Sequence, residues 1–404
     1  MKLLSQIFIR TILIFSPLFP FTACTEIADS FYYDKFYSVT RQVIYTTSAA
    51  IDTLKNTDQA TAQIIAGLLP NKSIIVESIL YKTVTPDGSR VYASGLIARP
   101  KDEPVAGVIS ALHHTITDAS EAPSITMMTP DITMALLNYV VIVSDYIGYG
   151  STVRLTHPYL HVENTGRVQA DMVLAAGEYL KHKHNIDIDS YGGLYVMGYS
   201  QGGASSVDFM KVVQRDYSDK IHIKKAFIGG APLDLSVCMN TVMRDTISGY
   251  PVGIALVPIG LNYAENLNLD FNNVFSGRLL ENYPEWILSK KYETDVVNDS
   301  IGTTNAKEFL HADFFTEEKN PDILKLIDAA YRNSTTHGWT PASPIYIMHG
   351  IYDEAVPYEN AQAAYDYFRS RGCDVVLDAR YGTHTTTAVL FYIEMLGTMR
   401  YLLL

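Results

Sequence analysis

The chain has 404 residues, of which 48% are apolar, and it contains 25 glycines, 17 prolines and 3 cysteines. This composition excludes a disordered protein, a collagen-like fibre and a small disulfide-stabilised fold, while the length allows one large domain or two to three ordinary ones. The 31 basic and 43 acidic residues give a formal net charge of −12, which argues against nucleic-acid binding because negative charges repel the phosphate backbone.

Residues 1–23 have the pattern of a secretory signal peptide. Lys2 and Arg10 supply basic charge, an apolar run follows, and small residues precede Cys24. A spanning helix needs about 20 uninterrupted apolar residues, and prolines interrupt this run, so an uncleaved anchor is the less favoured alternative. The region before Cys24 also resembles a bacterial lipobox. We therefore expect export to the cell envelope, in the periplasm or as an outer-membrane lipoprotein anchored through lipidated Cys24, with secretion as the alternative.

Residues 24–71 are loosely helical in pattern, and we expect them to form an N-terminal arm packed on the main body. Two following runs, 74–84 and 90–98, are rich in residues that favour strands. They flank Thr85-Pro86-Asp87-Gly88-Ser89, in which proline, aspartate and glycine favour a turn. The sequence therefore predicts a β-hairpin.

After residue 104, short and nearly continuous apolar runs alternate with helical patterns. Continuous apolar strands are buried on both faces, as in a parallel sheet covered by helices. The predicted strands are 105–112, 139–144, 194–197, 225–228, 345–348 and 375–377. The predicted helices are 131–138, 165–184, 202–213, 359–370 and 385–396. The expected fold class is α/β, with a mostly parallel sheet flanked by helices.

Residues 232–341 break this alternation, because they contain no clear strand but several helical patterns and many turn residues. A structureless loop of this length is implausible in a compact domain. We therefore expect a helical cap, or lid, inserted between two strands of a single α/β domain made of residues 72–231 and 342–404. The apolar run 249–258 would either line a substrate site or form the core of the cap.

The sequence Gly198-Tyr199-Ser200-Gln201-Gly202 matches the pattern G-x-S-x-G between a predicted strand and a predicted helix. The glycines allow a sharp turn with no side chains beside Ser200. Such a turn exposes the serine hydroxyl at the end of the strand, near the positive end of the next helix. The motif therefore predicts a nucleophilic serine, with a glycine-rich connection of no chemical role as the alternative.

A nucleophilic serine needs a base, and the base needs an acid that orients it. His384 follows the last predicted strand at the start of the final helix, and Asp353 follows the preceding strand. The order Ser200, Asp353, His384 is the chain order of an α/β-hydrolase. Glu354 and Asp378 are rival candidates for the acid.

A tetrahedral intermediate carries negative charge and needs hydrogen-bond donors, which form an oxyanion hole. One donor is expected from the backbone N–H of Gln201, the residue after the nucleophile. The other is expected from the loop after the strand at 105–112, where either His114 or Thr115 could supply an N–H. His113 has two interpretations of equal weight, a catalytic role or a structural histidine that holds this loop.

Residues 104–236 resemble the secretory lipase family of α/β-hydrolases, and the surroundings of Asp353 and His384 continue the resemblance. Residues 145–150 match the family's Asp-Tyr-x-Gly-x-Gly turn, and residues 198–203 match its Gly-Tyr-Ser-x-Gly-Gly elbow. His114 stands where the family usually has the glycine of a His-Gly-Thr motif. The resemblance implies an α/β-hydrolase fold, a helical lid in many members, and hydrolysis of esters with medium or long acyl chains.

Other polar residues have simpler interpretations. We expect Asp145 to form a turn by bonding to nearby backbone, and His157-Pro158-Tyr159 either to line a substrate entrance or to form a rigid surface loop. Cys238 and Cys373 would either pair or act as two buried apolar side chains.

Metal binding is not indicated by any spacing of cysteines and histidines. His182 and His184 lie near the end of a helical pattern, where cations suit the helix dipole. We expect neither a metal nor a cofactor.

The leading hypothesis is a serine ester hydrolase, a lipase or esterase, that works through an acyl-enzyme. A serine peptidase of the prolyl oligopeptidase type is the first alternative, because it shares this catalytic core. A noncatalytic binding protein of the cell envelope is the second. The sequence leaves the substrate open between a long acyl chain, an acetylated sugar and a feruloyl ester.

Overall fold

The computed structural model describes residues 33–55 and 59–402, so the predicted signal peptide and Cys24 lie outside the described residues. The strands are β1 (Phe36–Thr46), β2 (Ser73–Val84), β3 (Arg90–Pro100), β4 (Gly107–Leu112), β5 (Tyr139–Ser144), β6 (Leu194–Tyr199), β7 (Ile223–Gly229), β8 (Ile345–Gly350) and β9 (Val375–Arg380). In this part of the chain they form one sheet of nine strands in the order β1-β2-β3-β5-β4-β6-β7-β8-β9.

The sheet is mixed, with an antiparallel edge and a parallel body. β1, β2 and β3 pair antiparallel, and β3 pairs antiparallel with β5. The pairs from β5 through β4 and β6 to β9 are all parallel. The C-terminal ends of the parallel strands therefore meet at one edge of the sheet, where ligand sites of α/β proteins form.

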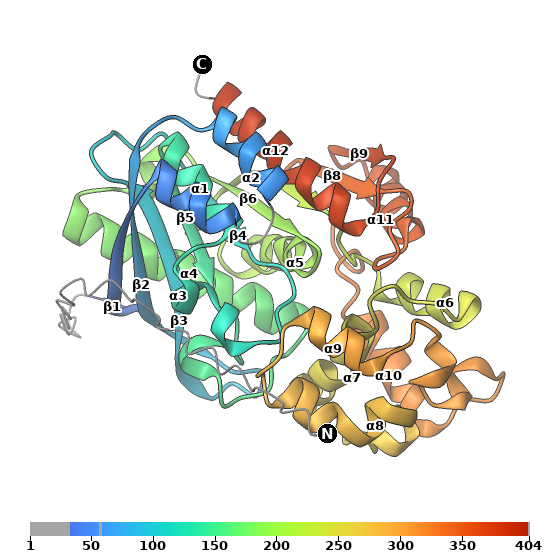
Figure 1. Cartoon of the computed structure of the whole chain (residues 1–404). Helices are drawn as coiled ribbons and strands as arrows, with labels where there is room; N and C mark the ends of the chain where they lie inside the picture. Colours follow the sequence, from blue (N-terminus) through green and yellow to red (C-terminus); the bar gives the residue numbers. More distant parts are fainter. Residues whose placement is uncertain (1–32, 56–58, 403–404) are drawn as a thin grey trace, which may run out of the picture.

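Helices cover both faces of the sheet (Figure 1). The helices are α1 (Thr47–Lys55), α2 (Gln59–Leu68), α3 (Pro123–Thr126), α4 (Val162–His184), α5 (Gln201–Asp216), α6 (Leu235–Asp245), α7 (Pro251–Glu265), α8 (Gly277–Tyr283), α9 (Thr294–Ile301), α10 (Pro321–Arg332), α11 (Tyr358–Ser370) and α12 (His384–Tyr401). One hydrophobic cluster joins the sheet to α4, α5 and α11, and a second joins it to α1, α2 and α12. In Figure 1, α12 lies beside α2, although the two are far apart in the sequence.

The predicted strands and hairpin are confirmed, but the helical prediction for the arm is wrong in its first half. Residues 36–46 form the edge strand β1, which pairs with β2 along its length. β-Branched and aromatic side chains favour this conformation, and pairing with a neighbouring strand satisfies the backbone. The later half of the arm is helical, as α1 and α2. The predicted helix at 131–138 is a 3₁₀ helix over Pro130–Leu137.

The interval between β7 and β8 contains helices α6 to α10, shown in yellow and orange in Figure 1, which enclose a hydrophobic cluster of their own. In the run 249–258, Val252 and Leu256 are buried in that cluster, which confirms the core interpretation for them. Ile254 and Val257 line an apolar cavity between α6, α7 and α10. We call this interval the helical insertion.

Lys290 links the helical insertion to the α/β body. Its buried ammonium donates to the carbonyl oxygens of Gly148, Val153 and Leu155 at 2.5, 2.9 and 2.5 Å, which uses all three of its N–H bonds. The same nitrogen lies 5.2 Å from the ring centre of Tyr149. Burial lowers the pKa of Lys290 to about 8. The contacts hold the insertion against the loop that follows β5.

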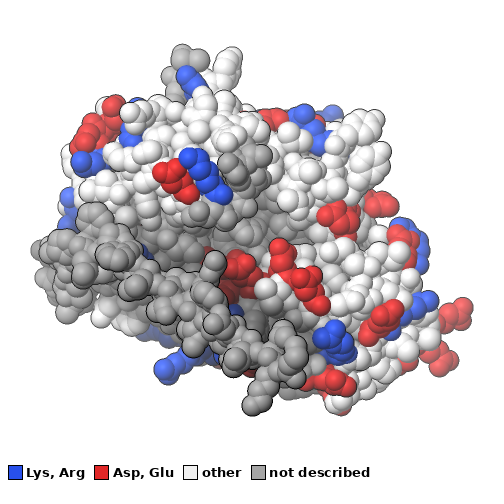
Figure 2. Space-filling model, viewed as in Figure 1, with Lys and Arg blue, Asp and Glu red and all other residues white. Residues whose placement is uncertain are grey.

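Charged side chains of both signs lie on the face shown in Figure 2. There, basic residues lie among acidic ones, and over the whole sequence the acidic residues outnumber the basic ones, 43 to 31. Among the described residues, no helix combines the length and the apolar character needed to cross a membrane.

Candidate active site

Ser200 occupies the turn between β6 and α5, in the strand–turn–helix context that the sequence predicts. Its backbone has φ 56° and ψ −123°, a conformation of the first central position of a type II′ turn, which glycine adopts most easily. The turn also lies close to β4, because a Cβ built on Gly202 would be 1.9 Å from the carbonyl oxygen of Leu112. A side chain at position 202 would therefore push the turn away from β4.

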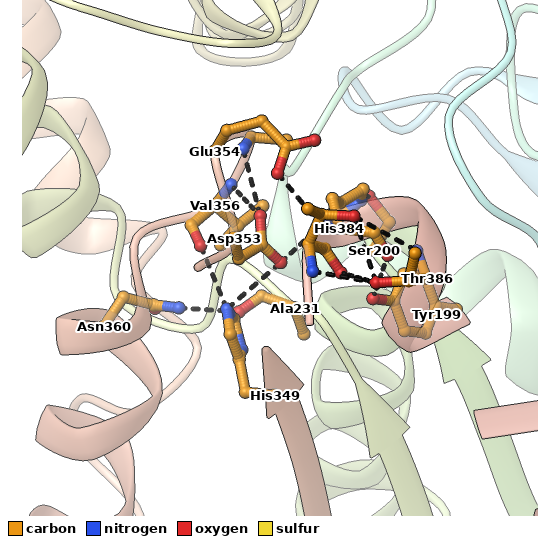
Figure 3. Close-up of polar contacts among 12 residues, drawn as sticks. Tyr199, Ser200, Ala231, His349, Asp353, Glu354, Val356, Asn360, His384 and Thr386 are labelled. Carbon is orange, nitrogen blue, oxygen red and sulfur yellow. Dashed lines mark hydrogen bonds and ion pairs between the residues drawn. The ribbon is translucent and has the colours of Figure 1, made fainter. Parts of the chain in front are cut away.

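Ser200, His384 and Asp353 form a continuous row of hydrogen bonds (Figure 3). The Ser200 hydroxyl donates to Nε2 of His384 over 3.0 Å. Nδ1 of His384 donates to Oδ2 of Asp353 over 2.7 Å. The three residues follow β6, β8 and β9, so the parallel sheet brings them to one edge. The Asp353 side chain is fully buried, whereas that of His384 is 17% exposed.

The rival acids contact other groups. Oε2 of Glu354 accepts from the backbone N–H of His384 over 3.2 Å. The carboxylate of Asp378 accepts from Arg380 over 2.5 Å and from the hydroxyl of Tyr346. Among the described residues, the hydrogen bonds of the His384 ring therefore go to Asp353 and Ser200.

The predicted oxyanion residues lie on two adjoining segments. Gln201 is the first residue of α5, so its backbone N–H has no acceptor within the helix. Leu112, just before the other segment, pairs with Gly198 in the neighbouring strand. His114 reaches the surface; desolvation by the surrounding protein lowers its pKa, and repulsion from His384 lowers it further. Thr115 is buried, with its hydroxyl 2.9 Å from that of Tyr159.

The buried side chain of His157 contacts Gln201, a contact that sequence reasoning missed. Its Nε2 lies 2.7 Å from Nε2 of Gln201, and its Nδ1 lies 2.8 Å from the carbonyl oxygen of Ile147. Burial lowers the pKa of His157 to about 3, so the ring is neutral, with its proton assigned to Nδ1. The surface-loop interpretation is wrong for this residue because its side chain is buried, whereas the entrance-wall interpretation stays a prediction.

His113 and Asp145 are buried beside this site. Nδ1 of His113 donates to the carbonyl oxygen of His114 over 2.7 Å, and burial lowers the pKa of His113 to about 4. These contacts favour its structural interpretation. Asp145 accepts from the backbone N–H of Ser124 over 2.8 Å and from the hydroxyls of Ser94 and Ser124. The prediction of a local turn bond is wrong, because at a buried strand end the carboxylate bonds to the elements packed against it.

Cys238 and Cys373 are both free, so the predicted alternative of a disulfide is wrong. Cys373 is buried, which fits the apolar interpretation. Burial raises the pKa of the Cys238 thiol, and the nearby Asp234 and Asp353 raise it further. The part of the chain that the structure describes contains no group of three side chains suited to hold a metal ion.

A second missed residue, His349, lies against Asp353. A sequence signal for it exists, because His349 precedes Asp353 by four residues at the end of a predicted strand. For His157 no such signal exists, because its partner Gln201 is 44 residues away and is set beside it by the fold.

Comparisons with known proteins agree on one family. Residues 120–391 match the family model for secretory lipases. The chain is 24% identical over 216 residues to the secreted triacylglycerol lipase LIP5 of Malassezia furfur, covering 52% of each protein. The matched regions cover only 38% to 52% of the curated relatives.

Solved structures show the same fold. The rice cell wall degrading esterase LipA from Xanthomonas oryzae aligns with a TM-score of 0.71 and 20% identity, over 90% of this chain and 96% of that one. A Legionella pneumophila protein aligns with a TM-score of 0.74 and 22% identity, over 91% and 98%. The architecture is therefore that of an α/β-hydrolase.

Proposed function

This chain belongs to the secretory lipase family, and from that premise we propose that it is a serine carboxylic ester hydrolase whose catalytic triad is Ser200, His384 and Asp353. One observation supports the assignment of these three residues to the triad. A serine hydroxyl on a sharp strand-to-helix turn lies 3.0 Å from a histidine whose other ring nitrogen lies 2.7 Å from a buried carboxylate. This is the geometry that activates a serine as a nucleophile.

The reaction follows from these contacts. Ser200 Oγ attacks the ester carbonyl carbon while Nε2 of His384 takes the hydroxyl proton, and Asp353 stabilises the resulting imidazolium. When the tetrahedral intermediate collapses, the bond to the alcohol oxygen breaks and His384 gives its proton to that oxygen. Water then attacks the acyl-enzyme with His384 as the base, and the acid leaves as the proton returns to Oγ.

The negative oxygen of each intermediate needs two donors. We assign one to the backbone N–H of Gln201, because the dipole of α5 favours negative charge there. The bond from the Gln201 side chain to His157 holds this residue in place. The second donor comes from the backbone of His114 or Thr115, on the loop that follows β4.

The substrate proposed is an ester with an apolar acyl chain. In this proposal residues 72–231 and 342–404 are the catalytic domain, and residues 232–341 are the cap. Support comes from the apolar cavity inside the helical insertion, lined by Met239, Val242, Ile254 and Val257 among others. Its wall includes Cys238, whose thiol is close enough to Asp353 to respond to its charge.

Two assays test this function. A fluorophosphonate probe is expected to label the wild-type chain and to leave Ser200→Ala unlabelled; undiminished labelling of the variant would refute the assignment of Ser200. Hydrolysis rates of p-nitrophenyl esters from acetyl to palmitoyl would then test the acyl chain. Rates that fall steeply beyond acetyl would contradict the apolar substrate.

The same preparation separates the alternatives. Family membership supports esters over peptides, so turnover of p-nitrophenyl esters is expected to exceed that of aminoacyl nitroanilides. A preference for the anilides would favour the peptidase alternative. Tight ligand binding that Ser200→Ala leaves unchanged, without turnover of any ester, would favour a binding protein.

We also propose that the protein is exported, because the related Malassezia lipases are described as secreted. Anchoring through Cys24 is a further step of this proposal. Mass spectrometry of the membrane fraction is expected to find Cys24 acylated at a new N-terminus, and Cys24→Ala is the matched control. An unmodified Cys24 would contradict anchoring and leave export in place.

A further inference from the structure

The carboxylate of Asp353 has a second histidine beside it. His349 is the penultimate residue of β8, and its side chain is fully buried (Figure 3). Its Nε2 lies 3.4 Å from Oδ2 of Asp353 and 3.0 Å from the carbonyl oxygen of Val356. The carbonyl oxygen of Val356 accepts a hydrogen bond from this nitrogen, so the ring proton belongs on Nε2, and Oδ2 of Asp353 faces the same N–H at the longer distance.

The other ring nitrogen of His349, Nδ1, is buried without a hydrogen-bond partner in the part of the chain that the structure describes. Burial lowers the pKa of His349, so the ring is neutral and Nδ1 carries a lone pair rather than a proton. A buried group that leaves one nitrogen unsatisfied costs stability. The contacts of Nε2 are therefore the polar interactions by which a histidine at this position can offset that cost.

The N–H of His349 adds to the N–H groups that face Asp353. Oδ1 of Asp353 accepts from the backbone N–H groups of Ala355 and Val356, at 3.0 and 2.8 Å. Oδ2 faces Nδ1 of His384 at 2.7 Å and Nε2 of His349 at 3.4 Å. Three of these groups belong to loops or to a helix end. His349 alone belongs to a strand of the sheet, so it ties the carboxylate to the rigid body.

We propose that His349 is a positioning residue for the ester hydrolase reaction, which holds Oδ2 of Asp353 in place against His384. The proposal rests on the proposed function. By donating to the carbonyl oxygen of Val356, His349 also fixes the turn that presents Asp353. A carboxylate displaced by about 1 Å would misalign His384 with Ser200, and an error of that size costs up to about 100-fold in rate.

Side-chain geometry supplies a matched set of variants. The amide nitrogen of glutamine can take the position of Nε2 of histidine, whereas that of asparagine reaches only the position of Nδ1. His349→Gln therefore keeps a donor toward Asp353, and His349→Asn removes it with a similar loss of ring volume. Met348→Leu, at the adjacent buried position of β8, controls for a general disturbance of the strand.

Steady-state kinetics on the full chain test the proposal. For His349→Asn, kcat is expected to fall at least about 10-fold with KM little changed, while His349→Gln keeps most of the activity and Met348→Leu keeps all of it. Equal losses in the asparagine and glutamine variants, or losses that follow thermal stability alone, would overturn the proposal. If Ser200→Ala hydrolysed esters at the wild-type rate, the proposed function itself would fail.

The pH profile adds a readout that a purely structural role would not move. The N–H of His349 offsets part of the charge of Asp353, so its loss leaves more of that charge to stabilise a protonated His384. The acid limb of kcat/KM is then expected to move to higher pH in His349→Asn and to stay in place in Met348→Leu. Among the described residues, the other titratable groups facing these rings are His114, Tyr199, Glu354, Tyr358 and Glu359. An unmoved acid limb would overturn the proposal.

A measurement on the unaltered chain covers variants that do not fold. Long-range proton–nitrogen NMR distinguishes the two neutral forms of a histidine ring. The resonance of His349 can be assigned through its contact with Tyr358, whose ring centre lies 6.0 Å away. The proposal requires the proton on Nε2. A proton on Nδ1 would leave Asp353 without this donor and refute it.

Discussion

Replacing Ser200 by glycine or by alanine separates chemistry from backbone strain. Both variants lose the hydroxyl and its contact with His384, so both are expected to be inactive. They differ in the Cβ atom, which Ser200 holds at φ 56° and ψ −123°. For a residue with a side chain, this conformation costs about 1–3 kcal/mol. Alanine keeps that cost, and glycine removes it.

The magnitude follows from two opposing effects. Relief of strain favours glycine by about 1–3 kcal/mol, while the greater freedom of glycine in the unfolded chain favours alanine by about 0.5–1 kcal/mol. The strain is the larger effect, so Ser200→Gly is expected to be more stable than Ser200→Ala by up to about 2.5 kcal/mol.

Urea unfolding at equilibrium measures this difference, because two variants with the same slope can be compared by their midpoints. A control pair at Ser206, inside helix α5, should give the opposite order, since glycine in a helix costs about 1 kcal/mol relative to alanine. If glycine were less stable than alanine at position 200 by about 0.5–1 kcal/mol or more, the turn would store no strain. The inference that the fold sacrifices stability to present this hydroxyl would then be wrong.

Three other predictions address the rest of the molecule. Lys290→Met removes the cost of burying the ammonium, about 3 kcal/mol for a pKa near 8, but it leaves three carbonyl groups without a donor, at about 1–3 kcal/mol each. Urea unfolding should therefore show a net loss of stability. Unchanged stability would refute the inference that Lys290 holds the helical insertion against the body. Burial raises the pKa of Asp131 to about 6, so the folded wild type loses stability as pH rises from about 4 to 7. At pH 8, but not at pH 4, the free energy of unfolding of Asp131→Asn should exceed that of the wild type by about 2–3 kcal/mol. A difference that is the same at both pH values would contradict this. Gly202→Ala should abolish ester hydrolysis, because its Cβ would lie 1.9 Å from the carbonyl oxygen of Leu112. The control Gly397→Ala, whose Cβ would have nothing within 4 Å, should leave the rate unchanged. Equal rates in the two variants would contradict the close packing of the turn.

Local sequence patterns predicted the strands and the turn at Ser200, and they supplied the order of the proposed triad, because each depends on spacing along the chain. The edge strand β1 was missed because its apolar positions were interpreted together with those of the helices that follow, without knowledge that β2 offers a partner. His157 and Lys290 could not be predicted as contacts. Their partners lie 44 and at least 135 residues away, and only the packed fold sets them beside each other.

The proposed site combines the edge of the sheet with the helical insertion, and these two parts come from different segments of the chain. The proposed triad of Ser200, Asp353 and His384 follows β6, β8 and β9, and His349 lies against its acid from within the sheet. The helical insertion has its own hydrophobic core and meets the body through contacts such as those of Lys290. Changes at the sheet edge should therefore lower kcat for every ester alike, since they alter the transition state common to all. Changes in the cavity of the insertion should alter kcat/KM by acyl chain, because one methylene in an apolar pocket contributes about 1–3 kcal/mol. Selection on the insertion can thus change the substrate without disturbing the triad.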